Sequence, residues 1–411
     1  MEKDILCKSC KKGKLKRFLE LGEIPPVNSF LDAREIHKEK AYPLNLAYCD
    51  SCLLVQLEEI VPPENLFSEY LHLSSASVSN IEHLKKVTQT LNSRFKINKD
   101  TKVLEIGSND GTLLSFLKEH TPKVIGVDPA KNLKAINQEK GIEYFAEFFN
   151  SSAAETILKE KGYFDIIIAL NVVPHTPNVV NLLEGVYKLL SPRGVFVMEG
   201  AYALETILKG EFDTIYHEHV YSFSFNSLIS TFKLAKLKVV DVEKIPTQGG
   251  SLRVYAQKEE EAKEQSPHVY ELMSQEIKEG LTSPKIYEAV KNKVGAFKNE
   301  LRRIIDNEKR IHGKLIGLGA PARGVVILNY CNLGVDDIDY LVDDTFLKQN
   351  KVSPGVHIPV KSWDAIIKDK KTGYFLLSWN YRDYFISRLK EIIPSFKIII
   401  PFPKLEVKKI G

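Results

Sequence analysis

The chain has 411 residues, a length that normally folds as two or three domains with separate hydrophobic cores. Its 57 basic and 53 acidic residues nearly balance, and no block of like charge is long enough to form a nucleic-acid-binding tail. The N-terminus lacks the basic and then apolar pattern of a signal peptide, and the longest apolar runs are too short to cross a bilayer. We therefore expect a cytoplasmic protein that binds neither nucleic acid nor a membrane.

Four of the five cysteines form two close pairs, Cys7-x-x-Cys10 and Cys49-x-x-Cys52. Each pair can offer two thiolates to one tetrahedral ion, and together they leave no ligand position for water. We interpret them as a structural zinc site in a small domain over residues 1–60, with two unrelated pairs of buried cysteines as the alternative. A redox role is disfavoured, because neither pair opens a helix in a strand–helix–strand pattern.

Residues 61–100 are expected to be largely helical, from Pro62 onwards. Within them lies a run rich in hydroxyl side chains, from Phe67 through Tyr70 to Ser77. Such a run can cap the start of a helix, and it can equally line a polar pocket in front of the next domain. Both interpretations remain open from the residues alone.

A glycine-rich turn follows the first strand of the central region. Residues 103–106 have a strand pattern, Gly107 and Gly111 flank the turn, and residues 112–118 are expected to form a helix. Asp128 ends the second apolar run, at a distance that suits the two hydroxyls of a ribose. This pattern predicts a nucleoside-binding unit.

The alternation of strands and helices continues to about residue 257. Residues 164–173 form a continuous apolar run, typical of a buried central strand, and a polar turn with His175 follows it. Ligands bind at this end of parallel strands. The order of features resembles the class I S-adenosylmethionine-dependent methyltransferases, whereas a nicotinamide enzyme would more often show G-x-G-x-x-G. The resemblance implies a set of cofactor-binding residues: Glu105, Gly107, Asn109, Gly111, Asp128 and Asn171.

The densest polar cluster of the chain is Tyr216-His217-Glu218-His219, with Tyr221 close behind. Either histidine can serve as a general base near neutral pH, Glu218 can orient it, and the tyrosines can donate to a developing oxyanion. A metal is disfavoured here, because no third ligand lies nearby. The alternative is that one histidine packs in the core and the remaining groups are exposed.

The last third of the chain contains a second Rossmann-like pattern. Residues 258–310 have helical spacing and are expected to link it to the central unit of residues 61–257. Residues 315–319 form a strand with a glycine turn, and Asp343 ends the next strand. The predicted fold is α/β in three parts, with the C-terminal domain over residues 311–411. In the central unit, Gly249-Gly250 is expected to form either a tight turn or a close backbone approach to a ligand.

Taken together, these motifs resemble the sugar C-methyltransferases that act on nucleotide-linked 4-keto deoxyhexoses. The segments that show this resemblance are the four cysteines and residues 103–111, 216–219, 248–253, 317–324 and 329–331. The resemblance implies S-adenosylmethionine as methyl donor, structural Zn²⁺, a nucleotide sugar carrying thymidine diphosphate, methylation at C3, and a monomeric enzyme. It also implies the catalytic set His219 as base, with Tyr216, Glu218, His175 and Tyr70.

The chemistry suits these residues, because a ketone at C4 acidifies the C3 proton and a neutral imidazole can remove it. Two other functions remain open: an O-methyltransferase acting on a sugar hydroxyl, and a non-catalytic protein that binds zinc and a nucleoside. The sequence also leaves open whether His219, His217 or His175 is the base, and which nucleotide, sugar substituents and stereochemistry apply.

Overall fold

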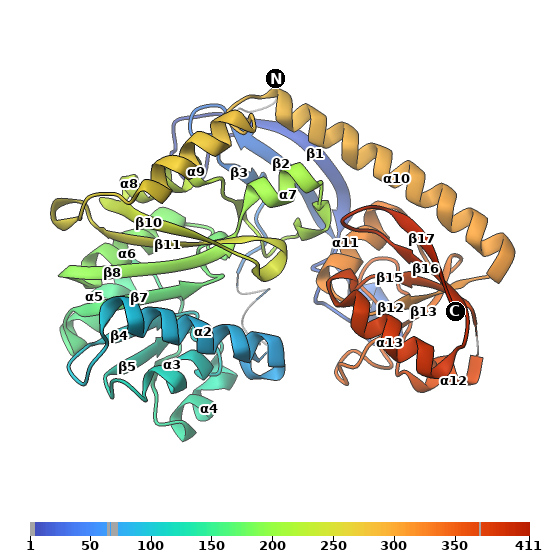
Figure 1. Cartoon of the computed structure of the whole chain (residues 1–411), viewed down its shortest axis with the longest axis horizontal. Coiled ribbons are helices and arrows are strands. Elements are labelled where there is room, and N and C mark those ends of the chain that lie inside the picture. Colours follow the sequence, from blue (N-terminus) through green and yellow to red (C-terminus); the bar gives the residue numbers. More distant parts are fainter. Residues whose placement is uncertain (1–4, 64–65, 67–72, 370) are drawn as a thin grey trace.

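The computed structural model describes residues 5–63, 66, 73–369 and 371–411. Within these residues the strands form three sheets of four, seven and six strands. Figure 1 shows the seven-stranded sheet on the left, the six-stranded sheet on the right and the N-terminal strands between them. Each of the three predicted parts therefore has a sheet of its own.

The N-terminal sheet has the order β1-β2-β3-β9. Its first three strands are β1 (Leu15–Ile24), β2 (Tyr42–Cys49) and β3 (Val55–Leu57). The fourth, β9 (Tyr221–Ser222), directly follows the Tyr-His-Glu-His segment and pairs antiparallel with β3. The cysteine-containing region thus shares a sheet with the predicted catalytic segment.

The central sheet has the order β10-β11-β8-β7-β4-β5-β6. From β6 to β8 all neighbours are parallel, and β11 and β10 complete the sheet in antiparallel orientation. The strands are β4 (Val103–Ile106), β5 (Val124–Val127), β6 (Glu143–Phe145), β7 (Phe164–Leu170), β8 (Leu190–Ala201), β10 (Leu237–Ile245) and β11 (Ser251–Lys258). The chain proceeds outward in opposite directions from β4 and β7, which makes their carboxyl ends the switch point where ligands bind in such sheets.

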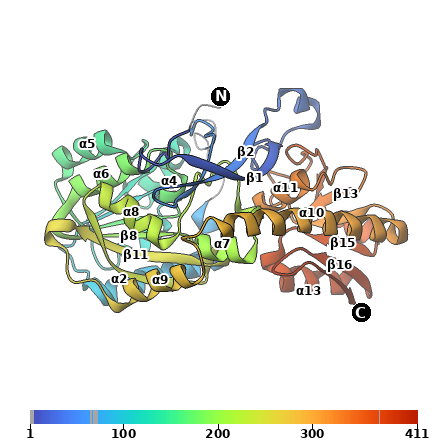
Figure 2. The same ribbon diagram turned by 90° about the horizontal axis from the view of Figure 1, so that it is seen from above.

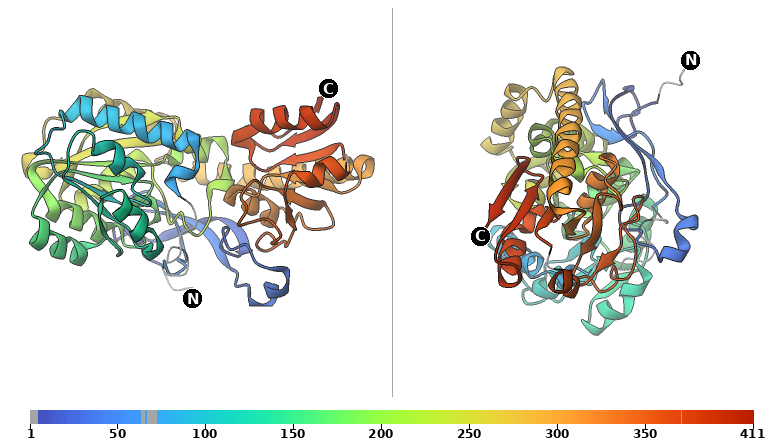
Figure 3. Two further views of the ribbon diagram at one scale, coloured as in Figure 1. Left: turned by 90° about the horizontal axis from the view of Figure 1, so that it is seen from below. Right: turned by 90° about the vertical axis from the view of Figure 1, so that its right-hand side faces the viewer.

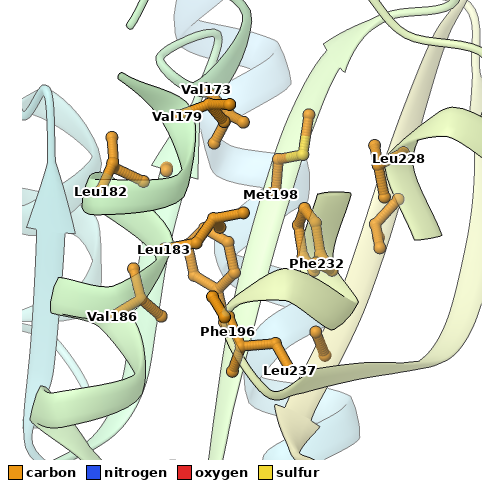
Figure 4. Close-up of a cluster of buried hydrophobic side chains, with 14 of the residues drawn as sticks. Val173, Val179, Leu182, Leu183, Val186, Phe196, Met198, Leu228, Phe232 and Leu237 are labelled. Carbon is orange, nitrogen blue, oxygen red and sulfur yellow. The ribbon is translucent and has the colours of Figure 1, made fainter. Parts of the chain in front are cut away.

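The core of this unit forms because the apolar run of β7 is buried and the amphipathic helices cover the sheet. Figure 4 shows α6 (Val179–Leu189) facing β8 and α8 (Phe225–Leu234), with Leu183 directed toward Phe196. Val173, fully buried in the same cluster, begins the short 3₁₀ helix η4 (Val173–His175). Packing of Val173 therefore fixes the position of His175 at the end of β7.

Helix α2 (Val78–Phe95) begins later than expected. Residues 61–63 are not helical, and Pro63 disfavours helical geometry at the residue before it. The predicted start at Pro62 is therefore wrong. Ser77 caps α2 by accepting from the Asn80 amide at 3.4 Å, as the capping interpretation of the hydroxyl run expected. Residues 64–65 and 67–72, including Tyr70, lie outside the described residues.

Two helices connect the central and C-terminal units: α9 (Pro267–Lys278) and the long α10 (Lys285–His312). The buried side of α10 contacts β1 and the C-terminal strands β12 and β15. Figure 2 shows α10 running from α7 at the junction over the C-terminal unit, and the left view of Figure 3 shows the blue N-terminal strands along the same junction. The N-terminal sheet and α10 hold the two larger units together.

The C-terminal sheet has the order β14-β13-β12-β15-β16-β17, and only β17 is antiparallel. Its elements are β12 (Leu315–Leu318), α11 (Ala322–Tyr330), β13 (Ile338–Val342), β14 (Val360–Lys361), α12 (Asp364–Asp369), β15 (Gly373–Leu376), α13 (Arg382–Ile392), β16 (Phe396–Ile400) and β17 (Glu406–Ile410). The remaining helices of the central unit are α3 (Thr112–Leu117), α4 (Lys134–Glu139), α5 (Ser151–Lys161) and α7 (Ala203–Lys209). Both predicted Rossmann-like patterns thus fold as parallel sheets.

The first loops of the two parallel sheets share a hydrogen-bond pattern. Asp128 ends the second strand of the central unit and accepts from the Asn109 amide at 3.0 Å. Asp343 occupies the same place in the C-terminal unit and accepts from the Ala320 amide at 2.8 Å. Gly107 and Gly319 each donate to the strand that carries the aspartate.

Among the described helices, we find none with the length and apolar character needed to cross a membrane.

Candidate functional site

The four cysteines of the two pairs come together in one cluster. Their Sγ atoms all lie within 4.8 Å of one another, with Cys7–Cys52 and Cys10–Cys49 both at 3.7 Å. Bonds of about 2.3 Å in tetrahedral geometry place two thiolates about 3.8 Å apart, so these spacings fit Zn²⁺. The zinc interpretation is confirmed, and the set is closed, as in a structural site.

Hydrogen-bond donors surround the thiolates. Gln56 donates its side-chain amide to Cys7 Sγ at 3.1 Å, and the amides of Gly13 and Ser51 donate to Cys10 and Cys49 at 3.4 Å. Such donors stabilise ligating thiolates and fix their orientation. Gln56 belongs to β3, so the cluster and the strand that pairs with β9 are directly linked.

At the switch point of the central sheet, backbone conformation and close packing explain why the turn contains glycines at positions 107 and 111. Gly107, Asn109 and Gly111 all have positive φ, between 50° and 72°. A Cβ on Gly107 would lie 2.4 Å from Val172 Cγ2, and one on Gly111 would lie 2.4 Å from Asn137 Oδ1. Protein atoms therefore occupy the space that a side chain at either position would need, so close packing together with the positive φ requires glycine at both.

The turn is surrounded by carboxylates. Asp128 accepts from the Asn109 and Ala130 amides, which leaves lone pairs for further donors. Glu105, nearly buried, has an Oε2 atom without a partner among the described residues. Burial raises the pKa of Glu105 well above its usual value, and the charges of Asp128 and Asp110 raise it further. A group of buried carboxyl groups, one with an oxygen that has no partner among the described residues, suits the cationic methionine part of S-adenosylmethionine.

Asn109 has a partner within the protein. Its Oδ1 accepts from the Ser74 amide at 2.9 Å, and Asp110 accepts from the Ser75 amide at 3.1 Å. The 3₁₀ turn η2 (Ser74–Ala76) is thereby held against the glycine turn. The role of Asn109 shown here is to hold η2, and Asp110 shares it although sequence reasoning did not single it out.

The catalytic candidates meet on the other side of the switch point. The His175 and His219 rings lie edge to face, with centroids 4.7 Å apart, and the Tyr216 and His219 ring centroids are 3.9 Å apart. His219 Nδ1 lies 2.6 Å from the Thr214 carbonyl oxygen. Because a carbonyl only accepts, Nδ1 carries the hydrogen in the neutral ring and Nε2 has the free lone pair.

One cavity connects His175 and His219 to the carboxyl end of β7. It has a volume of about 20 Å³, enough for a water-sized group. The lining residues are Asn171, Pro174, His175, Ala201, Ala203, Thr206, Thr214, His219, Tyr221 and Ser222. Asn171 directly follows β7 and has a positive φ of 56°, so the end of this strand and both histidines share one space.

Burial keeps both imidazoles neutral near pH 7. It lowers the pKa of His175 to about 4, against a hydrogen bond to the Glu218 backbone. It also lowers the pKa of His219 well below the usual value, and the charges of His175 and Arg323 lower it further. The hydrogen bond to Thr214 opposes this shift without reversing it. A histidine that must accept a proton therefore starts in the required form.

The structure separates the other members of the polar cluster. His217 is buried against the Tyr42 ring, its Nε2 lies 3.3 Å from the Tyr42 carbonyl, and it does not line the cavity. Glu218 accepts from Asn28 at 2.8 Å, so the partner that orients His219 is the Thr214 carbonyl instead. Tyr221 donates its hydroxyl hydrogen to the Pro177 carbonyl at 2.6 Å. That hydrogen is therefore already used, whereas the sequence had suggested that it would stabilise an oxyanion.

Several contacts to the C-terminal unit were not expected. Asp213 accepts from Trp379 Nε1 at 2.8 Å, and Arg323 lies 3.6 Å from the Glu211 carboxylate. Gly249 adopts φ +89° with its Cα beside Glu211 and Arg323, so the Gly249-Gly250 turn approaches a protein ion pair. Nothing local in the sequence pointed to Trp379 as a partner of Asp213, because the two residues are far apart in the chain.

Three family profiles match consecutive parts of the chain: a zinc binding domain over residues 7–67, a methyltransferase domain over residues 81–242 and a C-methyltransferase C-terminal domain over residues 246–403. The C-methyltransferase NovU of Streptomyces niveus is 30% identical over 403 residues, which span 98% of this chain and 96% of NovU. This likeness extends over all three units.

Other relatives match less. The tRNA U34 carboxymethyltransferase of Helicobacter pylori (strain G27) is 32% identical over 111 residues, 25% of this chain and 41% of that protein. Among solved structures, the magnesium protoporphyrin IX methyltransferase of Synechocystis PCC 6803 with bound SAM shows 14% identity and a TM-score of 0.33, over 44% of this chain and 79% of that one. At such a score the likeness supports no conclusion.

Proposed function

Since the chain belongs to the S-adenosylmethionine-dependent C-methyltransferase family that includes NovU, we propose that it methylates C3 of a nucleotide-linked 4-keto deoxyhexose. The nucleotide in this proposal is thymidine diphosphate, and the branched deoxysugar is the product. His219 is the proposed base and Tyr216 the donor to the developing oxyanion, while His175, whose one hydrogen in the neutral ring goes to the Glu218 backbone, lines the cavity beside His219. The proposed cofactor residues remain those at the ends of β4, β5 and β7.

The observation that carries the proposal is the shared cavity of Asn171, His175 and His219. Carbon methylation needs a base, a donor for the enolate oxygen and the methyl donor around one carbon atom. In this proposal the switch point of the sheet holds the methyl donor, His219 is the base, and Tyr216 is the donor to the enolate oxygen. Among the described residues, the metal-type cluster is the cysteine set in the N-terminal unit.

In the proposed step, the protein's own side chains accept the proton and donate a hydrogen bond to the enolate oxygen. His219 Nε2 takes the C3 proton, because Nδ1 already donates to the Thr214 carbonyl. The electron pair of the broken C–H bond forms the C3–C4 double bond and the carbonyl π pair moves onto the C4 oxygen, where Tyr216 donates a hydrogen bond. Neutral His175 has one N–H, which donates to the Glu218 backbone. S-adenosylmethionine, when bound, supplies an electrophilic methyl group for the resulting enolate carbon.

A competing assignment is transfer to a sugar hydroxyl, which uses the same base but needs no ketone. We expect incubation with ¹³C-methyl-labelled donor and a panel of thymidine-diphosphate 4-keto deoxyhexoses to yield a product whose label couples to a quaternary sugar carbon by NMR. The matched control is the same sugar reduced to the 4-hydroxyl compound, which should remain unlabelled. A methoxy signal in either product would contradict the proposal.

A further inference from the structure

The segment that precedes the proposed base is anchored to the C-terminal unit by a partly buried hydrogen bond. Asp213, fully buried in η5 (Phe212–Thr214), accepts from Trp379 Nε1 at 2.8 Å. Trp379 begins the 3₁₀ turn η8 (Trp379–Tyr381), directly after β15 of the C-terminal sheet. A buried carboxylate requires such donors, because it loses its hydration on folding.

A second contact lies beside the first. The Arg323 guanidinium, from the first turn of α11, lies 3.6 Å from Glu211 and 5.1 Å from the Trp379 ring centroid. Glu211 and Asp213 flank Phe212, whose ring packs edge to face against Tyr330 and Phe402 of the C-terminal unit. Residues 211–213 are therefore held from one side by two hydrogen-bonding or ionic contacts and an apolar one.

The next residue connects this anchor to the base. The Thr214 carbonyl, which ends η5, accepts the Nδ1 hydrogen of His219. The Thr214 hydroxyl donates to the Glu211 carbonyl at 2.8 Å, which closes the turn on itself. The direction of the Thr214 carbonyl, and with it the ring orientation and tautomer of His219, therefore depends on how η5 is held.

We propose that Trp379 and Asp213 are positioning residues for the proposed base: their hydrogen bond holds η5 so that the Thr214 carbonyl fixes the orientation of His219. The C-terminal unit thus has a role in proton abstraction in addition to any contact with substrate. This inference rests on the proposed function, because it assumes that His219 is the base. Neither residue contacts the reacting atoms in this assignment.

The chain contains a matched control for the tryptophan. Trp363, the other of its two tryptophans, is buried in the same unit and has an Nε1 atom without a partner among the described residues. Trp379→Phe and Trp363→Phe both remove an indole N–H from the C-terminal unit. Only the first breaks the bond to Asp213.

The experiment measures deuterium exchange at C3 of the 4-keto sugar without methyl donor, together with turnover, KM and cofactor affinity. We expect Trp379→Phe to lower the exchange rate and kcat by about tenfold to a hundredfold, as misplaced catalytic groups do, with KM and cofactor Kd unchanged. Trp363→Phe should behave as wild type. Equal rates for the two variants, or a loss in KM alone, would overturn the inference.

A double-mutant cycle with Asp213→Ala keeps the test decisive if one variant folds poorly. Because both substitutions break the same bond, the combined variant should lose less than the product of the two single losses. Independent, multiplying losses would contradict a joint role. A wild-type protein without exchange or methylation would instead refute the proposed function, so the two failures are distinguishable.

Discussion

At the scale of residues, the site depends on which atom of each imidazole is available. The Thr214 carbonyl takes the Nδ1 hydrogen of His219, and the Tyr42 carbonyl lies beside His217 in a different part of the core. The sequence could point to the whole Tyr-His-Glu-His segment because four polar groups in succession are rarely buried without function. It could not divide the roles, since neighbouring side chains in the segment contact different units of the molecule.

The lowered pKa of His219 has a consequence for the pH dependence of activity. An ordinary histidine loses its base form as the pH falls through about 6.5. Burial and the charges of His175 and Arg323 keep His219 neutral at lower pH. We therefore expect the acid limb of the kcat/KM profile to lie below pH 6.5, measured in buffers of constant ionic strength, with near-ultraviolet circular dichroism as the folding control. A limb at or above 6.5 in folded protein would contradict this account.

At the scale of elements, the central strands could be predicted because each is a continuous apolar run followed by a turn. The pairing of β9 with β3 could not, because a two-residue strand has no periodicity and its partner lies more than a hundred residues earlier in the chain. For the same reason, the contact of η5 with η8 had no local signal. The zinc site could be recognised from the two cysteine pairs, because tetrahedral ligation imposes a fixed short spacing on each pair.

Because β3 pairs with β9, we expect the zinc site to affect catalysis indirectly. Zinc removal should loosen β3, through Cys49, Cys52 and Gln56, and with it the strand that follows His219. We expect Cys52→Ser to lower kcat by about tenfold or more while cofactor Kd changes little, because the base is misplaced and the cofactor turn is not. Cys331→Ser, at the buried cysteine outside the cluster, is the control.

Metal content measured by plasma mass spectrometry should show one zinc per chain in wild type and in Cys331→Ser, and a loss in Cys52→Ser. Full activity in zinc-depleted, folded protein would show that β9 is held without the metal. In that case the N-terminal unit would have no part in positioning the base.

At the scale of the whole molecule, the site lies where three units meet. The central sheet supplies Asn171 and His175, the N-terminal sheet pairs with the strand after His219, and the C-terminal unit holds the turn before it. The three-part organisation and the methyltransferase fold could be predicted from motifs within each part. The contacts of all three parts with one twelve-residue segment, residues 211–222, could be seen only in the structure.

The central claim is that His219 removes a proton from C3 of a 4-keto sugar, and exchange of that proton tests it most directly. The sugar nucleotide is incubated with enzyme in D₂O with S-adenosylhomocysteine in place of the methyl donor, and the C3 signal is followed by NMR. The account predicts rapid exchange by wild type and by His217→Ala, and none above background by His219→Ala with retained cofactor affinity. Exchange by His219→Ala at the wild-type rate, or none by a wild-type protein that still methylates its substrate, would contradict it.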